Sequence, residues 1–218
     1  FILRRVSAVT ADSDHVLSEA SRLCDTPLDT HNINFGITLD PCTVPKEKLV
    51  YSNRCLKKLY NTDKVLKAFS ALREGADGWR LVVAGDGAET EALKSLARDL
   101  GIDDCTDFVG FVDPATNRDY YCRASVYVSI PSSDSISLSL VEALGYGCIP
   151  FVSDLPANRE VIEDGCNGFI ESDLDSIDLS RHSHVDPLVL SQRRDKIVKR
   201  FSKAHNRQLY LDLYERCI

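Results

Sequence analysis

The residues best suited to chemistry lie between Pro131 and Glu142. Asp134 and Glu142 stand eight positions apart, with small residues between them, in a loop that leads into a helix predicted over 137–145. A phosphate bound at the start of a helix gains free N–H groups and the helix dipole, and the carboxylates could accept hydrogen bonds from sugar hydroxyls. Spacing leaves two structural alternatives open: Glu142 could form a capping box with Ser139, and Asp134 could be a turn residue.

Two other loops carry candidate anion-binding groups. Arg54 follows a strand predicted over 48–52 and precedes Lys57 and Lys58, so that an Arg and a Lys could neutralise a diphosphate. The alternative is a solvated loop charge. The turn Gly85-Asp86-Gly87 could bring backbone N–H groups close to a phosphate. It lacks the third glycine of a dinucleotide-binding fingerprint, since Thr90 stands there, and a plain strand-to-helix turn is the alternative.

These loops belong to a repeated strand–helix pattern. Short β-rich runs alternate with amphipathic stretches at a spacing of roughly 25 residues, which is typical of a doubly wound parallel sheet, an α/β Rossmann-like fold. Ligands bind such sheets outside the carboxyl ends of the strands. Gly101 is expected to end the second helix. The predicted strands are 48–52, 81–84, 107–110, 125–129, 149–152 and 168–170, and the predicted helices are 62–72, 89–100, 115–123 and 137–145.

The two ends of the chain do not follow this alternation. A candidate strand over 6–10 and a helix over 14–23 precede a linker-like stretch, 24–32, that is rich in Asp, Thr, Asn and Pro. We expect residues 1–32 to be the end of a different domain with its linker, and 33–218 to be the main domain. Two helices, over 187–200 and 202–217, are expected to close it. The chain has no Met, which favours a truncated or processed chain.

Composition and charge exclude several classes of protein. The chain has 218 residues, 33 of them acidic and 26 basic. Its net charge of −7 argues against sequence-independent binding to nucleic acid. No apolar run is long enough to predict a transmembrane segment. The eight cysteines form no CxxC pair, which favours buried free thiols in a reducing cytosol over a zinc site or a disulfide framework. His182 and His184 are interpreted as loop residues and not as metal ligands, so no metal site is predicted.

The order of the motifs resembles the C-terminal, nucleotide-binding half of retaining glycosyltransferases with two Rossmann domains (GT-B), specifically family 4, the glycosyl transferases group 1. The similarity runs from about Asn34 to Asp173 and resumes in the last helix. No single matching segment is specific for this family, but the order and spacing of the segments together are. The matching pieces are 49–54, 68–69, 83–87, 108–112, 124–131, 142–144, Gly147, Pro150, 158–160 and 163–168.

The resemblance implies roles for individual residues. Glu142 would hold the ribose hydroxyls of the nucleotide and Asp134 would face the donor sugar. Arg54 would bind phosphate, with Lys58 favoured over Lys57 as its partner. The family usually has Glu where Asp134 stands and glycines where Ser135 and Ser137 stand. Because of these differences, the resemblance does not identify the donor sugar. The remaining binding residues would be Gly85, Gly110, Phe111 and Val112 (the last three against the base), and Ser137, Leu138 and Ser139 at the diphosphate.

The resemblance also implies an activity. We expect the donor-binding half of an enzyme that moves a sugar from a UDP- or GDP-linked donor to an acceptor with retention of configuration, with no cofactor beyond the donor. The acceptor, a glycan or lipid-linked glycan, would be bound by an N-terminal domain of which residues 1–32 are the end, so this chain alone would be an inactive fragment.

The expected setting is surface polysaccharide or glycolipid assembly in the cytoplasm, with a full-length protein peripheral at the inner face of the membrane. Two other hypotheses are a non-catalytic nucleotide-binding subunit and a dinucleotide-binding oxidoreductase domain. The incomplete glycine fingerprint and the lack of a ribose-binding acid after the next strand speak against the oxidoreductase.

Overall fold

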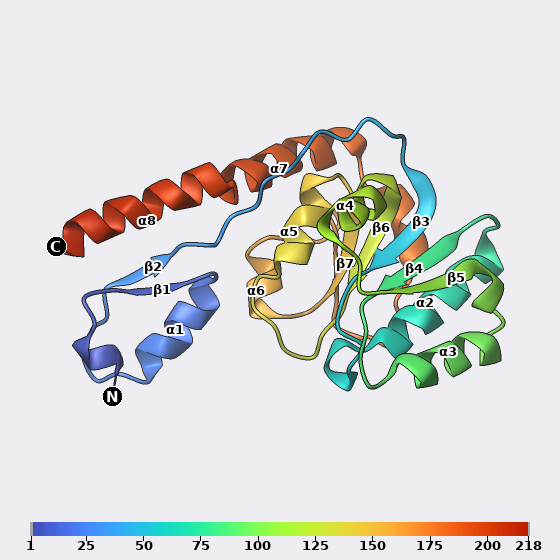
Figure 1. Cartoon of the computed structure of the whole chain (residues 1–218), viewed down its shortest axis with the longest axis horizontal. Coiled ribbons are helices and arrows are strands. Elements are labelled where there is room, and N and C mark those ends of the chain that lie inside the picture. The colour runs from blue at the N-terminus through green and yellow to red at the C-terminus, as the bar shows by residue number, and fades with distance from the viewer. Residues whose placement is uncertain (1, 218) are drawn as a thin grey trace.

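The main body is a six-stranded parallel sheet with helices on both faces (Figure 1). The computed structural model describes residues 2–217, with the side chain of Arg4 excepted. The strands lie in the order β5-β4-β3-β6-β7-β8. Counted from β3, this is the order 3-2-1-4-5-6 of dinucleotide-binding folds, so the predicted fold class is confirmed. The strands are β3 Glu47–Ser52, β4 Arg80–Ala84, β5 Thr106–Gly110, β6 Ala124–Ser129, β7 Ile149–Ser153 and β8 Phe169–Glu171.

The helices connect successive strands and cover the sheet. All those predicted are present within one to three residues of their expected ends, and Gly101, at φ +65°, follows the second of them as expected. One short helix, α6 Pro156–Arg159, is not predicted from the sequence. The helices of the body are α2 Thr62–Gly75, α3 Thr90–Asp99, α4 Pro114–Arg123 and α5 Leu138–Gly145, and α7 Pro187–Arg200 and α8 Lys203–Cys217 follow the sheet.

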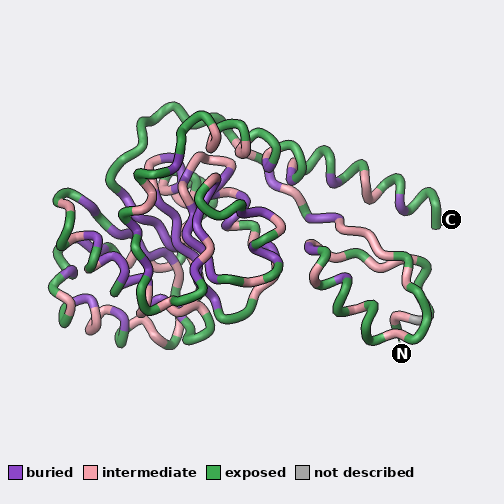
Figure 2. Tube along the Cα trace, turned by 180° about the vertical axis from the view of Figure 1, so that it is seen from behind, coloured by how far each residue is buried: buried purple, intermediate pink, exposed green. Residues whose placement is uncertain are grey.

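The core lies on both faces of the central strands (Figure 2). Alternate residues of β3 divide between the faces: Val50 packs with α2 and α3, whereas Leu49 and Tyr51 pack with α4. Burial on both faces explains why these strands are continuous apolar runs in the sequence. This arrangement leaves the strand ends, and the loops that follow them, as the accessible part of the sheet.

A small strand–helix–strand unit precedes the body. Strand β1 Val9–Ala11, helix α1 Asp14–Arg22 and strand β2 Thr30–Asn32 form a separate two-stranded parallel sheet (Figure 1). The prediction of a plain linker over 24–32 is therefore wrong at its end, because Thr30–Asn32 pairs with β1. Helix α8 reaches this unit: Arg216 donates a hydrogen bond to the carboxylate of Asp29, which lies between α1 and β2, at 3.1 Å.

Two other expectations need correction. Cys42, before β3, forms a disulfide with Cys122 of α4, with 5.7 Å between their Cα atoms, so the cysteines are not all free thiols. They lie 80 positions apart, and a pairing at that distance leaves no local signal in the sequence. Of the six free cysteines only Cys105 and Cys148 are buried. The predicted loop around His182 contains a 3-10 helix, Leu179–His184.

No helix within residues 2–217 combines the length and the apolar character needed to cross a bilayer.

Candidate functional site

The candidate site lies where the order of the strands reverses. Strands β3 and β6 are neighbours, yet the chain leaves β3 toward β4 on one side and leaves β6 toward β7 on the other. A crevice forms at the carboxyl ends of two such strands, because their connections run to opposite sides of the sheet. The loop with Arg54 follows β3, and the loop with Asp134 follows β6. The topology therefore brings both predicted anion-site loops to one place.

Arg54 makes the central contacts of this site. Its Nη2 donates to Oδ2 of Asp134 at 2.5 Å, and its Nη1 donates to Oγ of Ser137 at 2.6 Å. The Arg54 and Asp134 side chains are only 13% and 27% exposed, so the pair is largely shielded from water. The guanidinium also lies over the ring of Tyr60, 4.6 Å from its centroid. Arg54, predicted from the loop after the first strand of the sheet, is thus in direct contact with Asp134 and Ser137 of the 131–142 stretch.

Helix α5 begins at this contact. Ser137 is its N-cap, and its hydroxyl accepts from the N–H of Leu140. The capping-box alternative for Glu142 is wrong, because the cap is Ser137 and Glu142 is the fifth residue of the helix. The backbone N–H groups of Leu138 and Ser139 lie in the first turn, where a helix favours an anion.

Glu142 is half-buried one turn further along α5. Burial raises the pKa of its carboxyl group above the ordinary value, and a hydrogen bond from Tyr121 lowers the pKa in part. A buried carboxylate without a cation is costly unless hydrogen-bond donors satisfy it. The Glu142 carboxylate, in the second turn of α5, can therefore accept further hydrogen bonds.

The glycine turn packs two loops together. Gly85 has φ +125°, and a Cβ at this position would collide with the carbonyl oxygen of Arg54. A Cβ at Gly87 would collide with the carbonyl oxygen of Leu56. The N–H of Gly85 donates to the carbonyl of Gly110 at 2.7 Å, so it is already used. In this structure the turn sets the position of the Arg54 loop and offers no free N–H at Gly85.

The other predicted residues lie farther from the central contact. Gly110 is the last residue of β5, two strands from β3, and Phe111 and Val112 follow it. The Phe111 residue is 91% exposed. Lys58 is exposed on a 3-10 helix, Lys58–Tyr60, beside a cavity of about 380 Å³ that Lys57 and Glu89 also line. Within residues 2–217, Lys58 has no side-chain hydrogen bond or ion pair, and the structure does not bring it to Arg54.

Sequence reasoning missed several residues at this site. Ser135 donates to Asp12 of the small unit at 2.5 Å, and its Oγ lies 3.1 Å from that of Ser13. Beneath the loops, Asn53 connects Tyr121 and Tyr127 by hydrogen bonds of 2.8 and 3.0 Å. Asn53 and Ser135 lie in loops, where polar residues carry no periodic signal, and only their contacts identify them.

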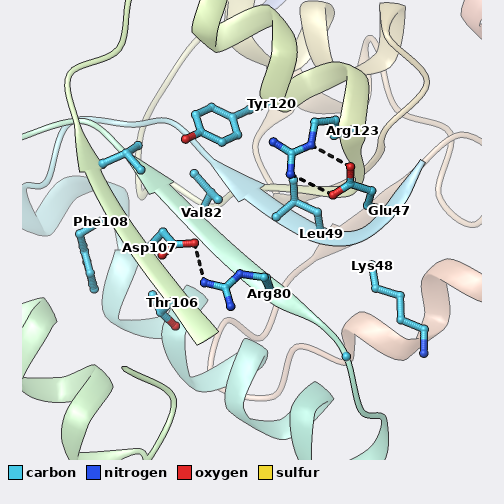
Figure 3. Close-up of a pocket in the computed structure, with 12 residues that line it drawn as sticks. Glu47, Lys48, Leu49, Arg80, Val82, Thr106, Asp107, Phe108, Tyr120 and Arg123 are labelled. Atoms are coloured by element: carbon cyan, nitrogen blue, oxygen red, sulfur yellow. Dashed lines mark hydrogen bonds and ion pairs between the residues drawn. The ribbon is translucent and has the colours of Figure 1, made fainter. Parts of the chain in front are cut away.

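Another cavity, larger than the one beside Lys58, lies at the opposite edge of the sheet. It measures about 560 Å³ at the amino ends of β3, β4 and β5 (Figure 3). Its two arginines are already paired: Arg123 donates to both carboxylate oxygens of Glu47 at 2.8 and 3.0 Å, and Arg80 donates to Asp107 at 2.8 Å. Because ligands of open α/β sheets bind at the carboxyl ends, we do not place the site there.

Comparison with known families agrees with this geometry. The sequence profile of the family "Glycosyl transferases group 1" matches residues 43–202, which is more than half of the chain. The chain belongs to this family. The match covers the whole parallel sheet and the loops with Arg54, Asp134 and Glu142. It favours a glycosyltransferase over the dinucleotide-binding oxidoreductase.

Two curated relatives are similar to this chain over part of their length. An uncharacterized glycosyltransferase of Haemophilus influenzae is 29% identical over 76% of this chain and 48% of its own length. The alpha-monoglucosyldiacylglycerol synthase of Streptococcus pneumoniae is 31% identical over 54% of this chain and 27% of its own length. The chain thus spans about half the length, or less, of these relatives.

Solved structures share the fold. The pneumococcal O-GlcNAc transferase GtfA in complex with UDP and GlcNAc superimposes with a TM-score of 0.84 at 18% identity, covering 98% of this chain and 46% of that one. Anabaena HepE in complex with UDP and glucose gives a TM-score of 0.83 at 15% identity, covering 98% and 64%. These likenesses confirm the Rossmann-like fold of GT-B glycosyltransferases.

Proposed function

We propose that this chain is the donor-binding half of a retaining glycosyltransferase of family 4. The complete enzyme moves a sugar from a UDP- or GDP-linked donor to a glycan or lipid-linked glycan. The observation that carries this proposal is the convergence of Arg54, Asp134 and the start of α5 at the switch point of the sheet. Structures of the same fold that contain UDP support the choice of ligand.

Each group has a role that its chemistry suits. A departing diphosphate develops negative charge, which the Arg54 guanidinium and the N–H groups of Leu138 and Ser139 stabilise. Asp134 then faces the hydroxyls of the donor sugar, and Glu142 accepts from the ribose hydroxyls. Gly110, Phe111 and Val112 lie against the base, and Lys58 approaches the phosphates when the donor binds. The proposal assigns neither a metal nor another cofactor to this reaction.

The acceptor belongs to a second domain. A two-stranded parallel sheet such as β1–β2 is too small to be stable by itself. We assign residues 1–32 to the end of an N-terminal acceptor domain and 33–218 to the donor domain, and expect this chain to bind nucleotide without transferring sugar. We place the complete enzyme in polysaccharide or glycolipid assembly at the cytoplasmic face of a membrane. A relative named for a lipid substrate, the phosphatidyl-myo-inositol mannosyltransferase of Mycobacterium leprae, supports the glycolipid part of this proposal.

Thermal unfolding with nucleotides tests the proposal. A ligand of the native state at 100 times its Kd stabilises by about 2.7 kcal/mol, or about 5–10 °C for a chain of this size. We expect this rise with UDP or GDP and none with NAD. Glu142→Ala should lose most of it, whereas Glu91→Ala, an exposed carboxylate of α3, should respond like the wild type. A rise with NAD alone would refute the proposal. An equal response of wild type and Glu142→Ala would refute the ribose role.

A further inference from the structure

The small unit contacts the candidate site at Ser135, in the loop between β6 and α5. Asp12 follows β1, and its Oδ1 accepts a hydrogen bond from the Ser135 hydroxyl at 2.5 Å. Ser13, fully buried at the N-cap of α1, has its Oγ 3.1 Å from the same hydroxyl oxygen. Asp12 and Ser135 are 123 positions apart, so this contact joins two distant parts of the chain beside Asp134.

The number of protons fixes the direction of each hydrogen bond in this cluster. A carboxylate only accepts, so the Ser135 hydroxyl donates its single proton to Asp12. The Ser13 hydroxyl is then the donor in its contact with Ser135, and its oxygen still accepts from the N–H of Val16. The Ser135 hydroxyl is thus held between one donor and one acceptor, both of which belong to the small unit.

Ser135 also holds the Asp134 carboxylate through its backbone. Its N–H donates to Oδ1 of Asp134 at 3.0 Å, while Oδ2 of Asp134 accepts from Nη2 of Arg54 at 2.5 Å. A continuous series of hydrogen bonds therefore connects the small unit to the arginine of the site, through Asp12, Ser135, Asp134 and Arg54. A residue without a hydroxyl at position 135 could not make the first of these contacts.

We propose that Asp12 is a positioning residue for donor binding: through Ser135 it holds the Asp134 carboxylate on Arg54, against the phosphate that would replace it. This inference rests on the proposed function, in which Arg54 binds the diphosphate. The phosphate and the carboxylate compete for one guanidinium. Each contact that fixes Asp134 in its pair with Arg54 therefore makes the exchange less favourable. The small unit thereby acts on nucleotide affinity without touching the nucleotide.

The expected effect of breaking this contact is opposite in sign to that of ordinary damage. When Ser135 loses its hydroxyl, the loop is no longer tied to Asp12, and the Asp134 carboxylate leaves Arg54 more easily. A phosphate then binds Arg54 at a lower cost. A substitution that merely disturbs the loop would misplace the first N–H groups of α5 and weaken binding. An increase in affinity therefore identifies the positioning role.

Calorimetric titration with UDP tests this inference. Ser135→Ala should bind UDP about threefold more tightly than the wild type, within the range of the net contribution of one hydrogen bond. Ser133→Ala is the matched control, because it removes an exposed hydroxyl of the same loop that makes no hydrogen bond within residues 2–217. It should match the wild type. In an Asp134→Asn background, Ser135→Ala should give no further gain, because the competing charge is already absent. Weaker or unchanged binding by Ser135→Ala would overturn the inference.

A double-mutant cycle separates the contact from the charge of Asp12. Asp12→Ala should also tighten UDP binding, but it should add little in the Ser135→Ala background, because both changes break the same contact. An equal gain in both backgrounds would show that Asp12 acts through its charge alone, and the positioning role would be wrong. If the wild type binds neither UDP nor GDP, the proposed function and this inference are both wrong.

A second measurement needs no ligand. Hydrogen bonds to Asp134 and Ser137 slow the rotation of the Arg54 guanidinium about its Cζ–Nε bond. Nitrogen-15 NMR measures this rotation, and the loss of the signal in Arg54→Lys assigns it. Ser135→Ala and Asp12→Ala should make the rotation several times faster, whereas Ser133→Ala should not change it. If all three variants match the wild type here, the inference is wrong and the proposed function stands.

Discussion

Arg54 already donates hydrogen bonds to two side chains in the structure without a ligand. Asp134 and Ser137 accept from its two terminal nitrogens, and water reaches the pair only partly. A phosphate that binds Arg54 must compete with the Asp134 carboxylate, because both seek the same guanidinium face. In the proposed function a phosphate would replace the Asp134 carboxylate as the partner of Arg54, so that the buried guanidinium stays paired.

Asp134→Asn separates nucleotide binding from transfer. We expect UDP to bind about threefold to tenfold more tightly, since a competing negative charge is removed at a short distance. Transfer by the complete enzyme should fall, because the contact to the donor sugar is lost. Calorimetry with UDP measures the first effect. Asp175→Asn, at the exposed pair with Lys64, is the control and should change nothing. Weaker UDP binding by Asp134→Asn would contradict the competition.

Glu142 lowers the stability of the fold while it is ionised. Its pKa is raised in the folded state, so the native protein prefers the protonated form, and the destabilisation is present above the folded pKa and lost as the pH falls below it. Glu142→Gln should therefore have a larger free energy of unfolding than the wild type at pH 7. The difference should disappear below the ordinary Glu value of 4.5. Urea unfolding at several pH values measures it; a constant difference would rule out this origin.

At the scale of elements, close contact between two loops decides where Arg54 lies. The turn after β4 approaches the Arg54 loop so closely that only glycine fits at Gly85 and Gly87. The N–H of Leu56 donates to the carbonyl of Asp86, and the N–H of Glu89 donates to that of Leu56. These backbone contacts hold the loop after β3 against the start of α3. The glycines are thus required for packing, and the packing positions the arginine.

Gly85→Ala tests this role. A Cβ at φ +125° would strain the backbone and collide with the Arg54 carbonyl, so we expect a loss of about 2–4 kcal/mol in the free energy of unfolding. UDP binding should also weaken as Arg54 shifts. Gly75→Ala, where a Cβ meets nothing within 4 Å, is the matched control and should be neutral or slightly stabilising. Denaturant unfolding compares the two variants, and similar values for both would contradict the packing role.

At the scale of the whole molecule, one carboxylate connects the small unit to the body. The two oxygens of Glu160, which follows α6, accept from the N–H groups of Asp14 and His15 at 3.0 Å each. These are the first residues of α1, where the helix dipole favours a negative charge. Glu160 therefore acts as a cap supplied from another part of the fold, and it orients α1 beside the candidate site.

Glu160→Ala should loosen the small unit without unfolding the sheet. Loss of this cap costs about 1 kcal/mol, so amide hydrogen exchange in α1 should become several times faster, while β3 and β6 keep their protection. Glu163→Ala, at an exposed pair with Arg193, is the control. Equal acceleration throughout the chain would show that Glu160 supports the whole fold and not this contact.

Local patterns in the sequence predict the parallel sheet, its helices and the loops at the carboxyl ends of its strands. Apolar runs and helical periodicity are local signals, and the handedness of strand–helix–strand connections converts them into a topology. Which side chains are in contact follows from the folded structure. The pairing of Arg54 with Asp134, the disulfide of Cys42 and Cys122, and the network around Asn53 join residues 64 to 80 positions apart. Such contacts depend on distances across the folded sheet, which no local pattern encodes.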